Sequence, residues 1–118
     1  MKEDNFAIET RDIRDGDWYW IQRAVYENYA QKIGAVGLAL YNAYASYAIN
    51  KGFVFPSQNT ISRKLRISIP TISKYNRILE KYGLIKIKSG KREGVSNVIY
   101  LLKIHRHIKE FKRGSKLL

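Results

Sequence analysis

The chain has 118 residues and a formal charge of +12, which is the size of one domain that can fold around a hydrophobic core of its own. It contains no Cys, which excludes disulfide frameworks, thiolate metal sites and cysteine nucleophiles and suits a reducing compartment. No apolar run is long enough to span a bilayer, and acids precede the first apolar stretch, which is unlike a signal peptide. We therefore expect a soluble, cytoplasmic protein with no membrane partner.

Residues 1–34 are expected to form an N-terminal arm and a short helix that pack on the core. Alternating residues before and after the turn-forming segment Arg14–Asp17 allow a β-hairpin over Phe6–Ile21. Aromatic residues at the spacing of Trp18 and Trp20 more often pack against a core than stack on bases, so we interpret them as structural. A helix is expected from Arg23 to Lys32, ending at Ile33 and Gly34.

The stretch Ala35–Ile49 is apolar on more than one side, which is typical of a buried helix. We interpret it as the central helix of a domain covering residues 35–102. Its tyrosines, Tyr41, Tyr44 and Tyr47, are amphipathic and leave a dimer interface open as an alternative.

Two short helices should follow an extended segment at Phe53–Phe55, which could pair with later strands. The first begins at Pro56 and Ser57, whose hydroxyl can accept an N–H of the first turn. The second begins at Ser68, with Pro70 in its first turn, where the missing N–H does no harm. Its apolar residues recur at three, four and three positions, which predicts one buried stripe: Ile72, Tyr75, Leu79 and Tyr82.

A β-hairpin should follow Gly83, with strands in Leu84–Lys88 and Val95–Leu102 joined by a glycine-containing turn. Beyond it, apolar residues from Leu101 to Phe111 recur at helical spacing. This pattern predicts a basic C-terminal helix and tail over residues 103–118.

These features resemble winged helix-turn-helix DNA-binding domains. The resemblance covers roughly Ala35–Leu102 and consists of a Pro-Ser helix start, a Ser-capped second helix and a Gly-Leu-Ile exit into a hairpin. It implies an α+β, mostly helical fold with a β-hairpin wing. The sequence departs from the family pattern at Arg66, where Gly is frequent in the turn, and at Asn76, where an aliphatic residue is common. If Arg66 adopts positive φ, the cost relative to Gly is about 1 kcal/mol.

The charge distribution agrees with a DNA-binding face. Residues 1–59 hold six Lys or Arg against seven acids, whereas residues 60–118 hold sixteen against three. Such a basic half indicates a polyanion partner, although a solubilising surface, a membrane surface or an acidic protein would also suit it.

The resemblance assigns DNA contacts to the second helix of the pair and to its surroundings. The candidates for base or phosphate contact on the recognition helix are Pro70, Thr71, Ser73, Lys74, Asn76, Arg77 and Lys81. The candidates for clamping the DNA backbone are Ser57, Arg63, Lys64, Arg66, Lys86, Lys88, Lys91 and Arg92. For Asn76 two interpretations stay open, adenine recognition and a hydrogen bond within the domain.

No pattern in the sequence predicts an enzyme. His105 and His107 have no convincing third metal ligand, and the acids from Asp12 to Asp17 lack the spacing of a calcium loop. We expect no cofactor and no small-molecule ligand.

The leading hypothesis is a sequence-specific double-stranded DNA-binding protein that regulates transcription in a prokaryote, or in a virus or plasmid living in one, and acts as a homodimer. Either the Tyr-rich helix or the C-terminal helix would join the two subunits. One alternative is an origin-binding replication initiator or replisome organiser. Another is a winged-helix module that binds an acidic protein.

Overall fold

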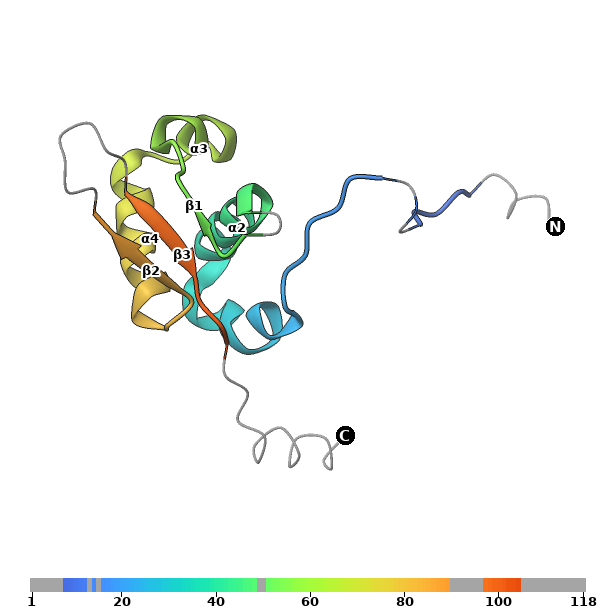
Figure 1. Ribbon diagram of the computed structural model, residues 1–118, viewed down its shortest axis with the longest axis horizontal. Helices are drawn as coiled ribbons and strands as arrows, with labels where there is room; N and C mark the ends of the chain where they lie inside the picture. Colours follow the sequence, from blue (N-terminus) through green and yellow to red (C-terminus); the bar gives the residue numbers. More distant parts are fainter. Residues whose placement is uncertain (1–7, 13, 15, 49–50, 90–96, 105–118) are drawn as a thin grey trace, which may run out of the picture.

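The computed structural model describes residues 8–12, 14, 16–48, 51–89 and 97–104, and Figure 1 shows their arrangement. The described part is α+β and mostly helical, as expected, with helices packed on one side of a small antiparallel sheet. Its elements, in chain order, are η2 (Val25–Tyr29), α2 (Ala30–Ala48), β1 (Phe53–Val54), α3 (Gln58–Leu65), α4 (Ile69–Lys81), β2 (Ile85–Lys88) and β3 (Val98–Leu101). In this part of the chain no helix is both long and apolar enough to cross a membrane.

The helices η2 and α2 correspond to the two helices expected over residues 23–49. η2 is a π-helical segment that runs directly into α2, and the path bends at Gly34, whose φ of 75° and ψ of 174° are not helical. The predicted boundary at Ile33 and Gly34 is therefore confirmed as a break in the helix. Beyond it, a Cβ at Gly37 would lie 2.9 Å from Ile33 Cβ, on the other side of the break at Gly34, so a larger residue there would clash with Ile33.

The helices α3 and α4 begin where the sequence places them. The Ser57 hydroxyl accepts a hydrogen bond from the Thr60 N–H at 3.2 Å, and the Ser68 hydroxyl accepts one from the Thr71 N–H at 3.2 Å. Each serine thus satisfies one of the amides that the first helical turn leaves without a partner.

The turn between α3 and α4 is short and strongly bonded. Arg66 ends α3 in the left-handed region, with φ 59° and ψ 45°, which accounts for the frequent Gly at this position in the family that the sequence resembles. The Ser62 hydroxyl donates to the Ile67 carbonyl at 2.6 Å, and the Ile67 N–H donates to the Ser62 carbonyl at 3.2 Å. These bonds fix the direction in which α4 leaves α3.

The sheet has the order β1-β3-β2, and both pairs of neighbours are antiparallel. β1 confirms that the extended segment at Phe53–Phe55 pairs with a later strand, since Phe53 lies opposite Tyr100. Alternate residues point to opposite faces. The inner face is buried against the helices through Val54, Ile85 and Ile99, and α4 packs next to β2.

The core lies between the inner face of the sheet and the helices. Its fully buried side chains come from every helix and from the segment after Gly83: Val25, Ile33, Leu40, Tyr44, Ile61, Ile72, Leu79, Leu84 and Ile85. The predicted stripe of α4 is confirmed, with Ile72 and Leu79 buried and Tyr75 and Tyr82 packed at the margin.

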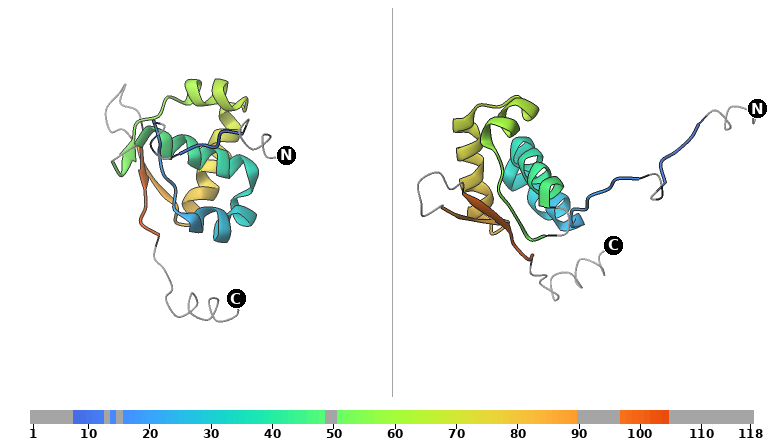
Figure 2. Two further views of the ribbon diagram at one scale, coloured as in Figure 1. Left: turned by 90° about the vertical axis from the view of Figure 1, so that its right-hand side faces the viewer. Right: turned by 45° about the horizontal axis from the view of Figure 1, so that its top comes forward.

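The N-terminal expectations are corrected by the structure. No strand occurs in the described residues of 8–22, so the hairpin expected over Phe6–Ile21 is absent there. Trp18 and Trp20 are 43% and 70% exposed, so they do not pack into the core as expected. In Figure 1 and Figure 2 the first part of this segment, drawn in dark blue, extends away from the helices and the sheet, whereas Tyr19 and Ile21 contact the folded part.

The C-terminal expectation is corrected at its start. Leu101 belongs to strand β3, and residues 102–104 are not helical, although Ile104 reaches the core. The remainder of the expected helix, including His105 and His107, lies outside the described residues.

Candidate nucleic-acid interface

The exposed side of α4 carries a row of basic side chains. This basic row consists of Lys74, Arg77 and Lys81, and the exposed Pro70 precedes it on the same side. The four residues recur at intervals of four, three and four, which places them along one face of the helix. The opposite face holds the buried Ile72 and Leu79. α4 therefore presents cations to solvent over its whole length while its other side anchors it to the core.

The small polar residues at the start of α4 are less accessible than this row. Thr71 and Ser73 are both half-buried. The Thr71 hydroxyl lies 2.9 Å from the Ser68 hydroxyl, so it takes part in the cap of the helix. Ser73 and the first turn still border the exposed row, at the end of the helix that carries a partial positive charge.

Asn76 does not belong to the exposed row. Its side chain is 7% exposed, and its Oδ1 accepts a hydrogen bond of 2.6 Å from the Tyr44 hydroxyl on α2. Burial raises the pKa of Tyr44 to about 12, so the phenol stays protonated and donates to Asn76 Oδ1. Of the two interpretations of Asn76, the structure supports the hydrogen bond within the domain, and an adenine contact would require the side chain to leave the core.

Further cations lie on α3 and in the turn after it. Arg63, Lys64 and Arg66 are exposed. The Lys64 ammonium lies 5.9 Å from the centre of the Tyr47 ring on α2, which directs it toward that helix. Ser57 is exposed as well, but its hydroxyl caps α3.

The charge of the α3–α4 segment is almost uncompensated. Residues 58–81 contain six Lys or Arg and one acid, Glu80. The Glu80 carboxylate accepts a hydrogen bond of 3.0 Å from the Ile87 N–H, so it serves to join α4 to β2. The basic row of α4 is therefore available to a polyanion.

Lys32 is a further basic residue of this region that the sequence did not indicate. Its ammonium lies 5.8 Å from the centre of the Tyr82 ring, and the Lys81 ammonium lies 5.5 Å from the same ring. The packing of the first turns of α2 against the end of α4 places both cations beside the Tyr82 ring. No local pattern around Lys32 could have shown this, because the neighbouring element is fifty residues away in the chain.

The strand lysines lie elsewhere. On β2 the lysines Lys86 and Lys88 alternate with the inward residues Ile85 and Ile87. Both lysines are exposed and point to the outer face of the sheet. Because α4 packs on the inner side, the structure does not bring these lysines onto the basic row of α4. Lys91 and Arg92, expected at the tip of the hairpin, lie outside the described residues.

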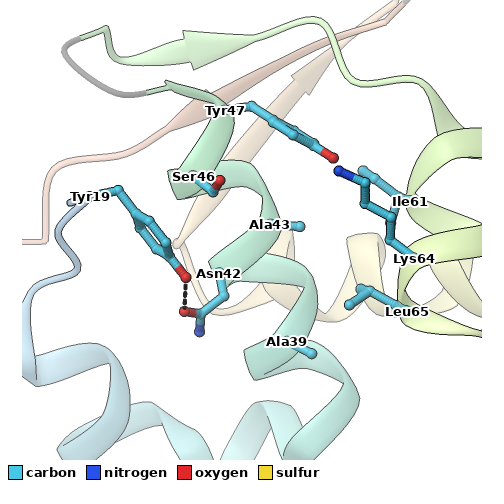
Figure 3. A pocket seen from close by; sticks show the side chains of 9 residues that line it. All are labelled: Tyr19, Ala39, Asn42, Ala43, Ser46, Tyr47, Ile61, Lys64 and Leu65. Carbon is cyan, nitrogen blue, oxygen red and sulfur yellow. Dashed lines mark hydrogen bonds between the residues drawn. The ribbon is translucent and has the colours of Figure 1, made fainter. Parts of the chain in front are cut away.

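A shallow groove of about 430 Å³ separates α2 from α3 (Figure 3). Small residues of α2, among them Ala39, Ala43 and Ser46, form its floor. The Tyr19 hydroxyl donates to Asn42 Oδ1 at 3.0 Å at one rim, and Lys64 and Tyr47 lie at the other. Among the described residues no group of three His, Asp or Glu side chains could hold a metal ion.

Two solved structures resemble this arrangement of elements. One is the N-terminal domain of a DNA-binding protein, with a TM-score of 0.55 and 16% sequence identity over 100% of this chain and 95% of that chain. The other is a chain in a Rep–DNA complex, with a TM-score of 0.54 and 16% identity over the same shares. The chain shares its fold with these domains. No protein-family model matches the sequence, and no curated protein does so either.

Proposed function

We propose that this chain is a sequence-specific double-stranded DNA-binding protein of the winged helix-turn-helix type. The observation that carries the proposal is the exposed basic row of α4, formed by Lys74, Arg77 and Lys81 on a helix anchored by its opposite face. A major groove admits one α-helix, and Lys and Arg are the side chains that most often contact guanine edges and phosphates there. The fold that the chain shares with a DNA-binding protein domain and with a chain of a Rep–DNA complex supports the same conclusion.

In this proposal α4 is the recognition helix and α3 crosses the DNA backbone. Pro70, Thr71, Ser73 and Lys74 lie nearest the helix start and approach base edges, whereas Arg77 and Lys81 contact bases or phosphates. Arg63, Lys64 and Arg66 neutralise phosphates beside them. The hairpin of β2 and β3 is the wing, and it follows α4 as it does in that family.

Selection of bound duplexes from a random pool at near-physiological salt tests the proposal. We expect a single enriched consensus, and Lys74→Ala should change the preferred base at defined positions. Arg23→Ala removes an exposed cation outside the α3–α4 segment and serves as the matched control, which should select the wild-type consensus. A pool without enrichment would favour the interaction-module alternative, in which the basic helix meets an acidic protein.

Two biological roles suit such a protein, regulation of transcription and initiation of replication at an origin. The similarity to a chain of a Rep–DNA complex favours initiation of replication over regulation of transcription. The two differ in the arrangement of their sites. An initiator should find its consensus in several copies within an origin, whereas a transcription regulator should find it beside a promoter and repress or activate a reporter placed there.

We also propose that the chain binds DNA as a homodimer, since one domain of this size reads few base pairs and specific recognition usually needs two half-sites. Tyr41 and Tyr44 are buried within the subunit, which leaves Tyr47 as the exposed tyrosine of α2. An α2-based contact would therefore use Tyr47 and the small residues beside it. Measuring the mass in solution and on the selected duplex tests this prediction, and a monomer in both, on a consensus without symmetry, would contradict it.

A further inference from the structure

The outer face of the sheet carries three aromatic side chains, which we call the aromatic face: Phe53, Phe55 and Tyr100. Phe53 and Tyr100 lie directly opposite each other on β1 and β3, so they point to the same side, and the buried neighbours Val54 and Ile99 show that this side faces away from the helices. The three side chains are 37%, 62% and 36% exposed, respectively. These rings come from two segments that are more than forty residues apart and meet only because β1 pairs with β3.

The rings touch one another at an angle and not as parallel stacks, so each contact covers at most one flat face of a ring. The centres of the Phe53 and Phe55 rings are 5.8 Å apart at an interplanar angle of 88°, which is an edge-to-face contact. The centres of the Phe53 and Tyr100 rings are 6.0 Å apart at 46°. An edge-to-face or tilted pair holds the rings in place and leaves flat surface to which another planar group can stack.

Lysines border these rings. Lys86 lies directly opposite Tyr100 on β2, and Lys88 points to the same face two residues later. The sheet and its described flanking residues, 51–55, 84–89 and 97–104, contain four lysines and no carboxylate. The cores of protein–protein interfaces are depleted of charged residues and of Lys in particular. Aromatic rings bordered only by positive charges are therefore unlike the core of a typical protein–protein interface.

We propose that the aromatic face binds single-stranded nucleic acid, with bases stacked on the rings of Phe53, Phe55 and Tyr100 and phosphates neutralised by Lys86 and Lys88. Aromatic rings in a positively charged track are the general means by which proteins hold unpaired strands, because every base has a flat face and every nucleotide a phosphate. An exposed sheet that displays aromatic rings is one such surface. A base pair inside a duplex keeps its flat faces stacked on its neighbours, so double-stranded DNA cannot use these rings in this way.

The aromatic rings of this inference take no part in the proposed duplex contact, although Lys86 and Lys88 are candidates in both. α4 packs on the inner side of the sheet, so the basic row and the aromatic face are separate surfaces. A protein with both surfaces could hold a duplex site and an unpaired strand at the same time.

Fluorescence anisotropy of the full chain with labelled oligo(dT) and oligo(U) tests the proposal. The variants are Phe55→Ala and Tyr100→Ala, since alanine substitution at a stacking ring should weaken single-strand binding at least about fivefold. Lysine variants are unsuitable here, because Lys86 and Lys88 are also candidates for clamping a duplex. Trp20→Ala is the matched control, since it removes an exposed aromatic ring from the N-terminal segment and should leave the affinity unchanged.

Each ring variant is also measured with the duplex consensus. We expect duplex affinity to change less than twofold in Phe55→Ala, whereas Lys74→Ala should change base discrimination in the duplex and keep its affinity for the single strand. Failure of the duplex proposal and failure of this one are thereby distinguished. Comparing oligo(dT) with oligo(U) shows whether the bound strand is DNA or RNA. Weaker binding of either oligomer by the ring variants supports the aromatic face as the binding surface.

Photocrosslinking gives a readout that does not depend on stability. An oligomer with a single iododeoxyuridine should crosslink to a peptide that contains Phe53, Phe55 or Tyr100. The proposal is overturned if the wild-type protein binds neither oligomer at low salt, or if folded ring variants bind as well as wild type. It is equally overturned if the ring variants turn a dimer into a monomer without weakening single-strand binding, because the rings would then be a subunit contact.

Discussion

At the scale of single residues, the buried pair of Tyr44 and Asn76 is the main departure from an apolar core. Asn76 occupies a position of α4 where an aliphatic residue would pack, and the 2.6 Å hydrogen bond from Tyr44 satisfies its Oδ1. In the described part of the chain no buried side-chain nitrogen or oxygen lacks a partner. The pair joins α2 to α4 with a defined geometry, which nonpolar contacts alone would fix less strictly.

Replacing Tyr44 by Phe should lower the free energy of unfolding by about 1–3 kcal/mol, because it leaves the Asn76 oxygen buried without a donor. Denaturant unfolding measures the change. In the double variant Tyr44→Phe with Asn76→Leu, we expect much of the loss to be recovered, since both partners are then apolar. Equal stabilities of wild type and Tyr44→Phe would contradict this account.

The raised pKa of Tyr44 predicts a loss of stability in alkali. The folded state holds the phenol proton with a pKa of about 12, above the value of about 10 for an unfolded tyrosine. The stabilisation is complete below pH 10 and is lost as pH rises through 12, because the unfolded chain releases the proton first. Burial raises the pKa of Tyr41 as well, so Tyr44→Phe should show a smaller alkaline loss that does not vanish. Thermal unfolding followed between pH 8 and pH 11 measures both curves.

At the scale of elements, α4 divides its residues between two tasks. Ile72 and Leu79 are fully buried, and Lys74, Arg77 and Lys81 are exposed on the other side. The Ser68 cap and the short turn after Arg66 fix where the helix starts. The rotation of α4 about its axis, and thus the set of side chains offered to DNA, follows from the buried face.

Substitutions on the two faces should therefore have opposite effects. Ile72→Ala should lower stability by about 2–5 kcal/mol through lost burial and a cavity, while the folded fraction keeps its sequence preference. Lys74→Ala should barely change stability and should cost about 1–3 kcal/mol of discrimination at one base. Ser73→Ala should change base discrimination less than Lys74→Ala does, because Ser73 is half-buried.

Unfolding curves and binding to a panel of mutated consensus duplexes measure both quantities. The reverse pattern, in which Lys74→Ala unfolds the chain and Ile72→Ala changes its target, would show that the wrong face of α4 has been assigned to DNA.

At the scale of the whole molecule, charge is distributed unevenly along the chain. Sixteen of the twenty-two cationic residues lie in residues 60–118, with three acids among them. This half contains α3, α4 and two of the three strands. The field of the molecule should therefore direct polyanions to this half.

Duplex binding should weaken steeply as salt is added. The slope of log affinity against log salt should be about 0.9 for each phosphate neutralised, because each contact releases condensed counterions. Removing one of Arg63, Arg77 or Lys81 should reduce the slope by about one such contact. Titrations at several salt concentrations give the slope, and an affinity that does not depend on salt would contradict an electrostatic interface.

The sequence by itself determined the features that depend on neighbours in the chain. The caps at Ser57 and Ser68 and the spacing of Ile72 and Leu79 are local, because helix ends and helix faces are set within a few residues. The left-handed conformation of Arg66 was allowed by the sequence and was established by the structure. The two strands after Gly83 followed from alternation and composition, and the extended character of Phe53–Phe55 allowed a pairing without fixing its partner.

Only the tertiary structure decided which side chains meet across the fold. The burial of Asn76 depends on Tyr44, thirty-two residues earlier, and the aromatic face exists because β1 pairs with β3. For Trp18 and Trp20 the sequence-based prediction was wrong. Their spacing usually indicates packing against a core, but both side chains are exposed. Periodicity reports which face of an element is apolar, whereas the partner of that face is fixed by contacts between segments that are distant in the chain.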